Sequence, residues 1–309
     1  MDSSIKTLAR TGLGVALAVA WLSLPALASA QQATSKAGYA GEAACLTCHE
    51  AQSKGYHDTA HGRAWSTGSP RAGTGCESCH GPGQAHAEAG GDRTKIRTFK
   101  DEPAADVNEA CQSCHTKGER ALWEGSAHDT RGMSCTTCHS VHAPKSADWQ
   151  LNKVSQQEVC VTCHRSQVQK LQRSAHMPVR EGKMACSSCH NPHGTTNVKL
   201  LKVGTSVNDS CVSCHAEKRG PMLWEHAAVT ESCTSCHDSH GSNNERMLVA
   251  RQPFLCQRCH VTARHPPTIY DGYLLRASQN ANKIYGRSCV VCHQLVHGSN
   301  APSGKMFLR

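Results

Sequence analysis

One five-residue pattern, Cys-x-x-Cys-His, recurs ten times along the 309-residue chain. The cysteine pairs are Cys45 with Cys48, Cys76 with Cys79, Cys111 with Cys114, Cys135 with Cys138, Cys160 with Cys163, Cys186 with Cys189, Cys211 with Cys214, Cys233 with Cys236, Cys256 with Cys259, and Cys289 with Cys292. The histidines that close the motifs are His49, His80, His115, His139, His164, His190, His215, His237, His260 and His293. The motifs use all 20 cysteines, so no thiol remains for a disulfide, a zinc site or a nucleophile.

In an exported protein this pattern is typical of a site for covalent attachment of c-type haem. The two intervening residues place both sulfurs along one edge of the macrocycle, and the adjacent histidine faces the iron. A single motif could also be a redox dithiol or half of a zinc site. Ten copies without a spare cysteine argue against both alternatives and predict ten covalently attached haem c groups.

The remaining histidines divide the motifs into five two-motif repeats, which we number 1 to 5 along the chain. In each repeat the first motif is followed by a lone histidine, and the second motif by a trailing histidine. The lone histidines are His61, His128, His176, His226 and His265, and the trailing ones are His86, His142, His193, His240 and His297. Repetition at a short period is typical of proteins whose units stack on their neighbours.

These ten histidines are the predicted second axial ligands of the ten haems. The chain has 21 histidines, so eleven lie outside the motifs and one is surplus. We assign the surplus to His57, which departs from the offset that His61 shares with its counterparts; His86 and His265 are the least regular of the predicted ligands. The methionines Met133, Met177, Met184, Met222 and Met247 do not recur once per motif, so methionine ligation is not expected.

The trailing histidine is too close to its own motif to share that motif's iron. His142 lies three residues beyond His139, a span of at most about 10 Å when extended. Axial ligands must approach opposite faces of the macrocycle, so we expect His142 to serve a neighbouring haem. Two histidines at every iron would leave no open coordination position. The sequence therefore favours an electron-transfer protein over an enzyme, and we predict no catalytic residue.

The composition predicts a fold with very little regular structure. Aromatic residues make up 4% of the chain, with only three Phe, so the polypeptide alone cannot build a large core. We expect a multihaem cytochrome c fold, mostly irregular with short α-helices and little or no sheet. Longer helices are expected at 154–174 and near 211–228, and surface loops at 65–75, 81–105 and 266–288. The haems themselves would supply the core.

The formal net charge of +9 does not predict a nucleic-acid-binding protein. Without residues 1–30, which contain Asp2, Lys6 and Arg10, the chain would carry +8. Ten haems would add two propionates and one ferric-core charge each, so the oxidised protein would carry about −2 in total. We expect the basic side chains to neutralise propionates.

Residues 1–30 have the pattern of a secretory signal peptide. Lys6 and Arg10 form the positive region, 11–27 the apolar segment, and Ala28-Ser29-Ala30 a cleavage site. An uncleaved membrane anchor is the alternative. Cleavage after Ala30 would release residues 31–309 outside the cytoplasm, and we expect a periplasmic protein.

The chain resembles the periplasmic decahaem cytochromes of porin–cytochrome conduits, the MtrA/MtoA/DmsE type, over roughly residues 43–309. The resemblance is most specific at Cys211 to Leu223, CVSCHAEKRGPML, and includes Trp224-Glu225-His226, the segment CSSCHNPHG from Cys186, and His297-Gly298-Ser299-Asn300. It implies an extended haem wire with bis-histidine ligation. It also implies two similar pentahaem halves, here 43–166 and 167–309, after a leader at 31–42.

The same resemblance implies partners. These are an outer-membrane β-barrel porin that encloses the cytochrome, periplasmic or inner-membrane c-type cytochromes, and an extracellular multihaem cytochrome as a further candidate. The expected function is electron transfer across the outer membrane, linked to Fe(III) or Fe(II), metal oxide or dimethyl sulfoxide. The alternatives are a free periplasmic electron carrier or store, and a multihaem reductase.

Overall fold

The computed structural model describes residues 37–66, 75–260 and 288–308. All of these except Ala37 belong to one compact body, Gly38–Arg309. The signal segment, His265 and most of the predicted loops at 65–75 and 266–288 lie outside the described residues.

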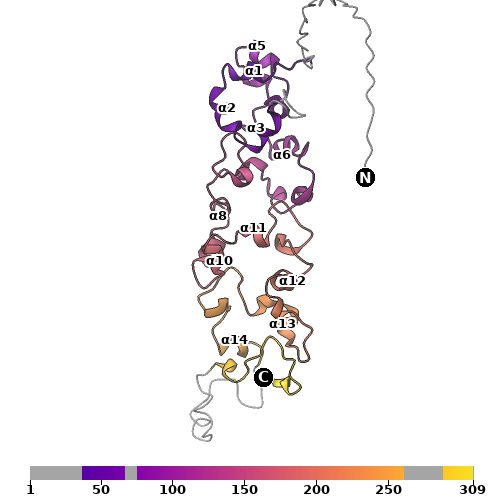
Figure 1. Cartoon of the computed structure of the whole chain (residues 1–309), viewed down its shortest axis with the longest axis vertical. Coiled ribbons are helices and arrows are strands. Elements are labelled where there is room, and N and C mark those ends of the chain that lie inside the picture. The colour runs from indigo at the N-terminus through magenta and orange to yellow at the C-terminus, as the bar shows by residue number, and fades with distance from the viewer. Residues whose placement is uncertain (1–36, 67–74, 261–287, 309) are drawn as a thin grey trace, which may run out of the picture. The chain divides into compact units, whose positions relative to one another are not determined.

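Short helices separated by irregular segments make up this body (Figure 1). The described α-helices are α1 (Glu42–Leu46), α2 (Glu50–Tyr56), α3 (Ala60–Trp65), α4 (Glu77–His80), α5 (Gln84–Glu88), α6 (Ala104–Gln112), α7 (Cys135–Cys138), α8 (Gln156–Val161), α9 (Arg165–Leu171), α10 (Met177–Arg180), α11 (Cys186–Cys189), α12 (Val207–Val212), α13 (Ala227–Glu231) and α14 (Phe254–Gln257). Short 3₁₀ turns are η1 (Arg93–Lys95), η2 (Gly118–Arg120), η3 (Asp129–Arg131), η4 (Asp148–Gln150), η5 (Val198–Leu200), η6 (Ala216–Lys218), η7 (Cys233–Ser235), η8 (Glu245–Met247), η9 (Cys289–Val291) and η10 (Gly304–Met306).

The described residues contain isolated β-bridges but no strand, which confirms the predicted fold class for that part of the chain. No described helix is long and apolar enough to cross a bilayer.

Each CxxCH motif forms a single helical turn. In all ten motifs the histidine N–H donates to the carbonyl of the first cysteine, at 2.9–3.0 Å. First motifs close a helix that begins upstream: the side chains of Ser155 and Ser206 cap α8 and α12 by accepting from the amides of Glu158 and Asp209. One turn brings both cysteines and the histidine to one side of the backbone.

The prediction of longer helices is wrong. Residues 154–174 contain α8 and α9, interrupted at His164, whose φ of −94° and ψ of 45° are not helical. His215 interrupts the second predicted helix in the same way, with φ −96° and ψ 55°. The motif histidine leaves the helical path, so the helix cannot continue through it.

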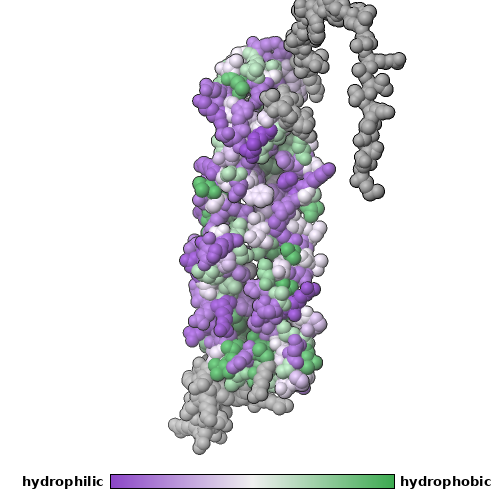
Figure 2. Space-filling model, viewed as in Figure 1, coloured by the Kyte–Doolittle hydropathy of each residue, from purple (hydrophilic) through white to green (hydrophobic). Residues whose placement is uncertain are grey.

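Very little of the polypeptide is buried. The buried hydrophobic side chains of the described residues are Tyr56, Val107, Trp123, Leu151 and Leu171. Trp149 is 74% exposed, and Figure 2 shows apolar and hydrophilic residues intermixed on the visible face. The polypeptide without haem therefore has no continuous apolar core.

Segments that follow the trailing histidines join consecutive repeats. Ser174, just before His176 of repeat 3, exchanges two backbone hydrogen bonds with Ser242 of repeat 4, at 2.9 and 3.1 Å. Trp224 and Ser299 form the same bridge between repeats 4 and 5. Gly241 lies beside the first of these contacts with φ +119°, and a Cβ there would collide with the Lys170 carbonyl and the Ala175 side chain.

We therefore expect Gly241→Ala to destabilise the holoprotein by about 1–3 kcal/mol, since it adds backbone strain and displaces a neighbouring backbone. Denaturant unfolding followed by circular dichroism measures the loss. Gly182→Ala is the matched control, because Gly182 also has positive φ, +71°, but faces open space. Gly182→Ala should lower the free energy of unfolding by less than Gly241→Ala does. Equal losses would contradict the role of the contact between repeats.

Candidate haem sites

Nine pairs of histidine rings face each other in the described residues. Their ring centres lie 5.7–6.4 Å apart. The pairs are His49–His86, His80–His142, His115–His61, His139–His193, His164–His128, His190–His240, His215–His176, His237–His297 and His260–His226. Every pair joins one motif histidine to one histidine predicted as a second ligand.

This spacing fits an iron between the two rings. A bond from a metal to an imidazole nitrogen is about 2 Å long. The ring centre lies about 1 Å farther out, so two axial imidazoles should have centres about 6 Å apart. Among the described residues, no group of three or more His, Cys, Asp or Glu side chains could hold a metal ion. When bound, a haem supplies a one-electron Fe(III)/Fe(II) couple.

The pairs connect neighbouring repeats in both directions. Trailing histidines point back: His142 of repeat 2 faces His80 of repeat 1 at 5.8 Å. Lone histidines point forward: His128 of repeat 2 faces His164 of repeat 3 at 6.2 Å. His86 is the exception, because it faces His49 within its own repeat. Each repeat thus completes sites that belong to its neighbours.

Two predicted histidines need separate mention. His265, the predicted partner for the tenth site, lies outside the described residues. His57, the predicted surplus histidine, lies 3.8 Å from a carboxylate oxygen of Glu42 and has no facing histidine ring in the described residues. Its position beside a carboxylate is typical of a surface polar residue.

The cysteines of consecutive motifs are also neighbours. Within a repeat, the first cysteines of the two motifs are near enough to perturb each other electrostatically. These pairs are Cys45 with Cys76, Cys111 with Cys135, Cys160 with Cys186, Cys211 with Cys233, and Cys256 with Cys289. Between repeats, second cysteines perturb each other in the same way, as in Cys138 with Cys163 and Cys189 with Cys214. Consecutive attachment sites are therefore neighbours along the chain order.

In seven of the ten motifs the two cysteines differ in exposure. Every first cysteine is half-buried, but the polypeptide leaves seven second cysteines exposed: Cys48, Cys114, Cys163, Cys189, Cys214, Cys259 and Cys292. The second cysteines Cys79, Cys138 and Cys236 are half-buried. The haem attached at each motif would cover these sulfurs.

In several site histidines the second ring nitrogen, Nδ1, donates to a main-chain carbonyl. His139, His190 and His237 of the second motifs donate from Nδ1 to the carbonyls of Trp149, Lys199 and Arg246, at 2.7–2.9 Å. The lone histidines His128, His176 and His226 donate to the carbonyls of Pro192, Ser239 and Val296, at 2.7–3.0 Å. A proton held on Nδ1 leaves Nε2 free to bind a metal and fixes the ring.

Burial favours the neutral form of three trailing histidines. It lowers the pKa of His193 to about 4, with repulsion from His139 acting in the same direction. Burial also lowers the pKa of His142 and His240. Since only the neutral imidazole binds a metal, the ligand form predominates at neutral pH.

Side-chain amides upstream of the first motif fix the start of the second. Asn108, three residues before Cys111, accepts from the Cys135 amide at 2.8 Å and donates to the Met133 carbonyl. Asn208, three residues before Cys211, accepts from the Cys233 amide at 2.8 Å. Sequence reasoning missed these residues. The shared Asn-x-x-Cys spacing was the available signal.

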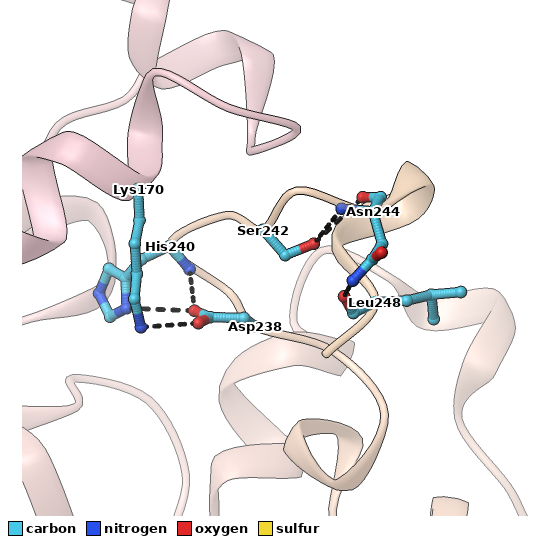
Figure 3. Close-up of polar contacts among 6 residues, drawn as sticks. All are labelled: Lys170, Asp238, His240, Ser242, Asn244 and Leu248. Carbon is cyan, nitrogen blue, oxygen red and sulfur yellow. Dashed lines mark hydrogen bonds and ion pairs between the residues drawn. The ribbon is translucent and has the colours of Figure 1, made fainter. Parts of the chain in front are cut away.

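The loop after a second motif has its own polar framework, shown for repeat 4 in Figure 3. Asp238 accepts from the His240 amide at 3.1 Å and from Lys170 of repeat 3 at 2.8 Å. Desolvation is the largest effect on the pKa of Asp238 and acts to raise it, but the hydrogen bonds from Lys170 and the His240 amide, with the attraction of Lys170, together lower the pKa. The side-chain nitrogen of Asn244 donates to the carbonyl of Leu248, and its backbone N–H donates to the hydroxyl of Ser242. The loop is thereby anchored to itself and to the preceding repeat.

Known proteins share these motifs. A model of the doubled CXXCH motif matches residues 176–220 and 226–265, and a model described as cytochrome c-type protein NrfB-like matches residues 76–155. The chain is 44% identical to the multihaem cytochrome MtrA of Shewanella baltica over 276 residues, which cover 87% of this chain and 81% of that protein.

A second similarity is to the cytochrome c-type protein NrfB of Escherichia coli O6:H1. It has 31% identity over 134 residues, 41% of this chain and 66% of that protein. With paired CxxCH motifs throughout, covalently bound haem c and the function of electron transfer follow. The chain belongs to the family of multihaem c-type cytochromes that includes MtrA.

Proposed function

We propose that this protein carries ten haems, each between two histidines, and that it conducts electrons across the outer membrane inside a β-barrel porin. The observation that carries the proposal is the set of nine facing ring pairs, each with one motif histidine and one histidine from elsewhere in the chain. By extension, His265 would be the second ligand at His293.

The order of the sites supports conduction from one end of the chain to the other. The nearest cysteines of consecutive motifs are first cysteines within a repeat and second cysteines between repeats, so motif n neighbours motif n + 1. Haems attached at adjacent thiols would lie close together, which short electron steps require. An occupied position on both faces of each iron would leave no place for a substrate, so we propose a carrier rather than a reductase.

The proposal of a porin partner rests on the similarity to MtrA together with the physical problem that the protein would solve. A bilayer with its headgroups is about 40–45 Å thick and does not conduct electrons. A β-barrel of more than 20 strands has a lumen wide enough for a plug. We place the cytochrome in the periplasm after removal of residues 1–30, with the division at 166/167 separating two pentahaem halves. Its partners would be periplasmic or inner-membrane cytochromes, the porin, and an extracellular multihaem cytochrome.

Ligand exchange tests the ring pairs. His142→Met should leave ten attached haems and raise the potential of one, because a thioether ligand favours Fe(II) more than imidazole does. The affected haem should be the one attached at Cys76 and Cys79, whose motif histidine is His80. Redox titration with paramagnetic NMR assignment locates it.

His57→Gln is the matched control for this exchange and should leave every low-spin signal unchanged. A perturbed haem at Cys135 and Cys138 in the His142 variant would refute the pairing.

Reconstitution tests the conduit. In liposomes that contain the protein with its co-purified barrel, external dithionite should reduce an internal dye, and an internal reductant should reduce external ferric citrate. Both directions are expected because similarly ligated haems have overlapping potentials. Liposomes with the barrel alone are the control. If the protein is recovered from its host wholly in the soluble fraction, without detergent, a free periplasmic carrier is the correct function.

A further inference from the structure

Gln150 lies in a two-residue left-handed turn that recurs in three repeats. The turns are Trp149-Gln150, Lys199-Leu200 and Arg246-Met247, all with φ between +51° and +61°. The first carbonyl accepts from the second-motif histidine, as described above. The second carbonyl accepts, at 2.8 Å, the amide that follows this histidine: Ser140, Asn191 or Asp238. The backbone role of position 150 is thus the same as that of Leu200 and Met247.

The side chain is what differs. Leu200 and Met247 are apolar, whereas the Oε1 atom of Gln150 accepts a hydrogen bond from Nδ1 of His61 at 2.9 Å. The corresponding lone histidines in repeats 2, 3 and 4 donate instead to main-chain carbonyls, those of Pro192, Ser239 and Val296. His61 is therefore the lone histidine whose partner in the described structure can be changed by substituting a side chain.

The orientation of the amide agrees with a role at a metal ligand. Nε2 of His61 faces Nε2 of His115 at 3.5 Å, so its Nδ1 must carry the proton if the pair holds an iron. Only the oxygen of the Gln150 amide can accept that proton. The amide nitrogen of Gln150 is buried and has no partner among the described protein atoms, so contacts of its own do not account for a polar residue at this position.

We infer that Gln150 is a positioning residue that sets the reduction potential of the haem attached at Cys111 and Cys114, through its hydrogen bond to His61. The inference rests on the proposed function, in which His61 and His115 hold that haem. A hydrogen-bond acceptor at Nδ1 makes the imidazole a stronger electron donor to the metal, which favours Fe(III) and lowers the potential. The effect is confined to one haem, because the other described second-motif turns carry apolar side chains at this position.

Substitution by the residue of a sister repeat is the sharpest test. Gln150→Met places the side chain of Met247 in an equivalent turn, so the fold should tolerate it. One tenth of the absorbance change in a spectroelectrochemical titration of the holoprotein should move to higher potential. The expected size is a tenfold change in the equilibrium, or about 59 mV for one electron. The ferric EPR signal from the His61–His115 pair, whose rings cross at 78°, should change with it.

Gln150→Glu provides the opposite sign, since a carboxylate is a stronger acceptor and the same tenth should move to lower potential. Gln169→Glu, at an exposed position of α9, controls for the added charge. The inference is overturned if the Gln150→Met titration coincides with the native one, or if both glutamate variants shift equally. Should Gln150→Met attach fewer than ten haems, Gln150→Leu, which copies the side chain of Leu200, takes its place.

His61→Ala separates this inference from the function beneath it. A high-spin haem in that variant together with unchanged Gln150 variants would remove the role of Gln150 and leave the ligand pair standing. Ten low-spin haems in His61→Ala would show that His61 is not a ligand, and both proposals at this site would then fall.

Discussion

The facing of two imidazole rings about 6 Å apart is the constraint on which the rest of the structure depends. One ring comes from a CxxCH turn, which can form anywhere in the chain, since it needs only a hydrogen bond from residue i + 4 to residue i. The second ring must arrive from another segment. In eight of the nine described pairs it arrives from a neighbouring repeat, so forming these sites also brings the repeats together.

This arrangement explains how a chain with so little apolar material can fold. Described helices such as α7 and α11 are one turn long, and the buried hydrophobic side chains are few. Isolated helices of that length are not stable in water. The polypeptide contacts that join repeats include the backbone bridge between Ser174 and Ser242, the Lys170–Asp238 ion pair, and close packing at Gly241. Haem surfaces would supply the remaining apolar burial, because eight of the nine described ring pairs would hold a haem between segments from two repeats.

The supporting hydrogen bonds give the sites a common design with local variation. Main-chain carbonyls in equivalent positions orient six of these rings. Three of the carbonyls belong to the left-handed turns at Trp149, Lys199 and Arg246, and three belong to the residue before a trailing histidine. A main-chain carbonyl is present whatever the side chain of its residue is, so that residue can be substituted without losing the hydrogen bond that orients the histidine ring. Gln150 departs from this design, and the departure falls at a junction between repeats, where a change in one potential would affect transfer in both directions.

The amino-acid sequence by itself determined the attachment chemistry, the two-motif repeat, the short helices and the absence of sheet in the described residues. These follow from local spacing and composition, as at Cys135 to His139, where five consecutive residues specify one helical turn. The sequence also excluded His139 as a partner for His142, because chain length limits reach. Sequence alone could not say which neighbour His142 faces, that lone histidines point forward while trailing ones point back, or that His86 stays in its own repeat. Nor did it predict the carbonyl acceptors, the exposed second cysteines or the break at His164. The ring pairs and their acceptors depend on where segments far apart in the chain meet, and only the tertiary structure decides this, because a histidine's identity carries no information about the direction from which its partner comes.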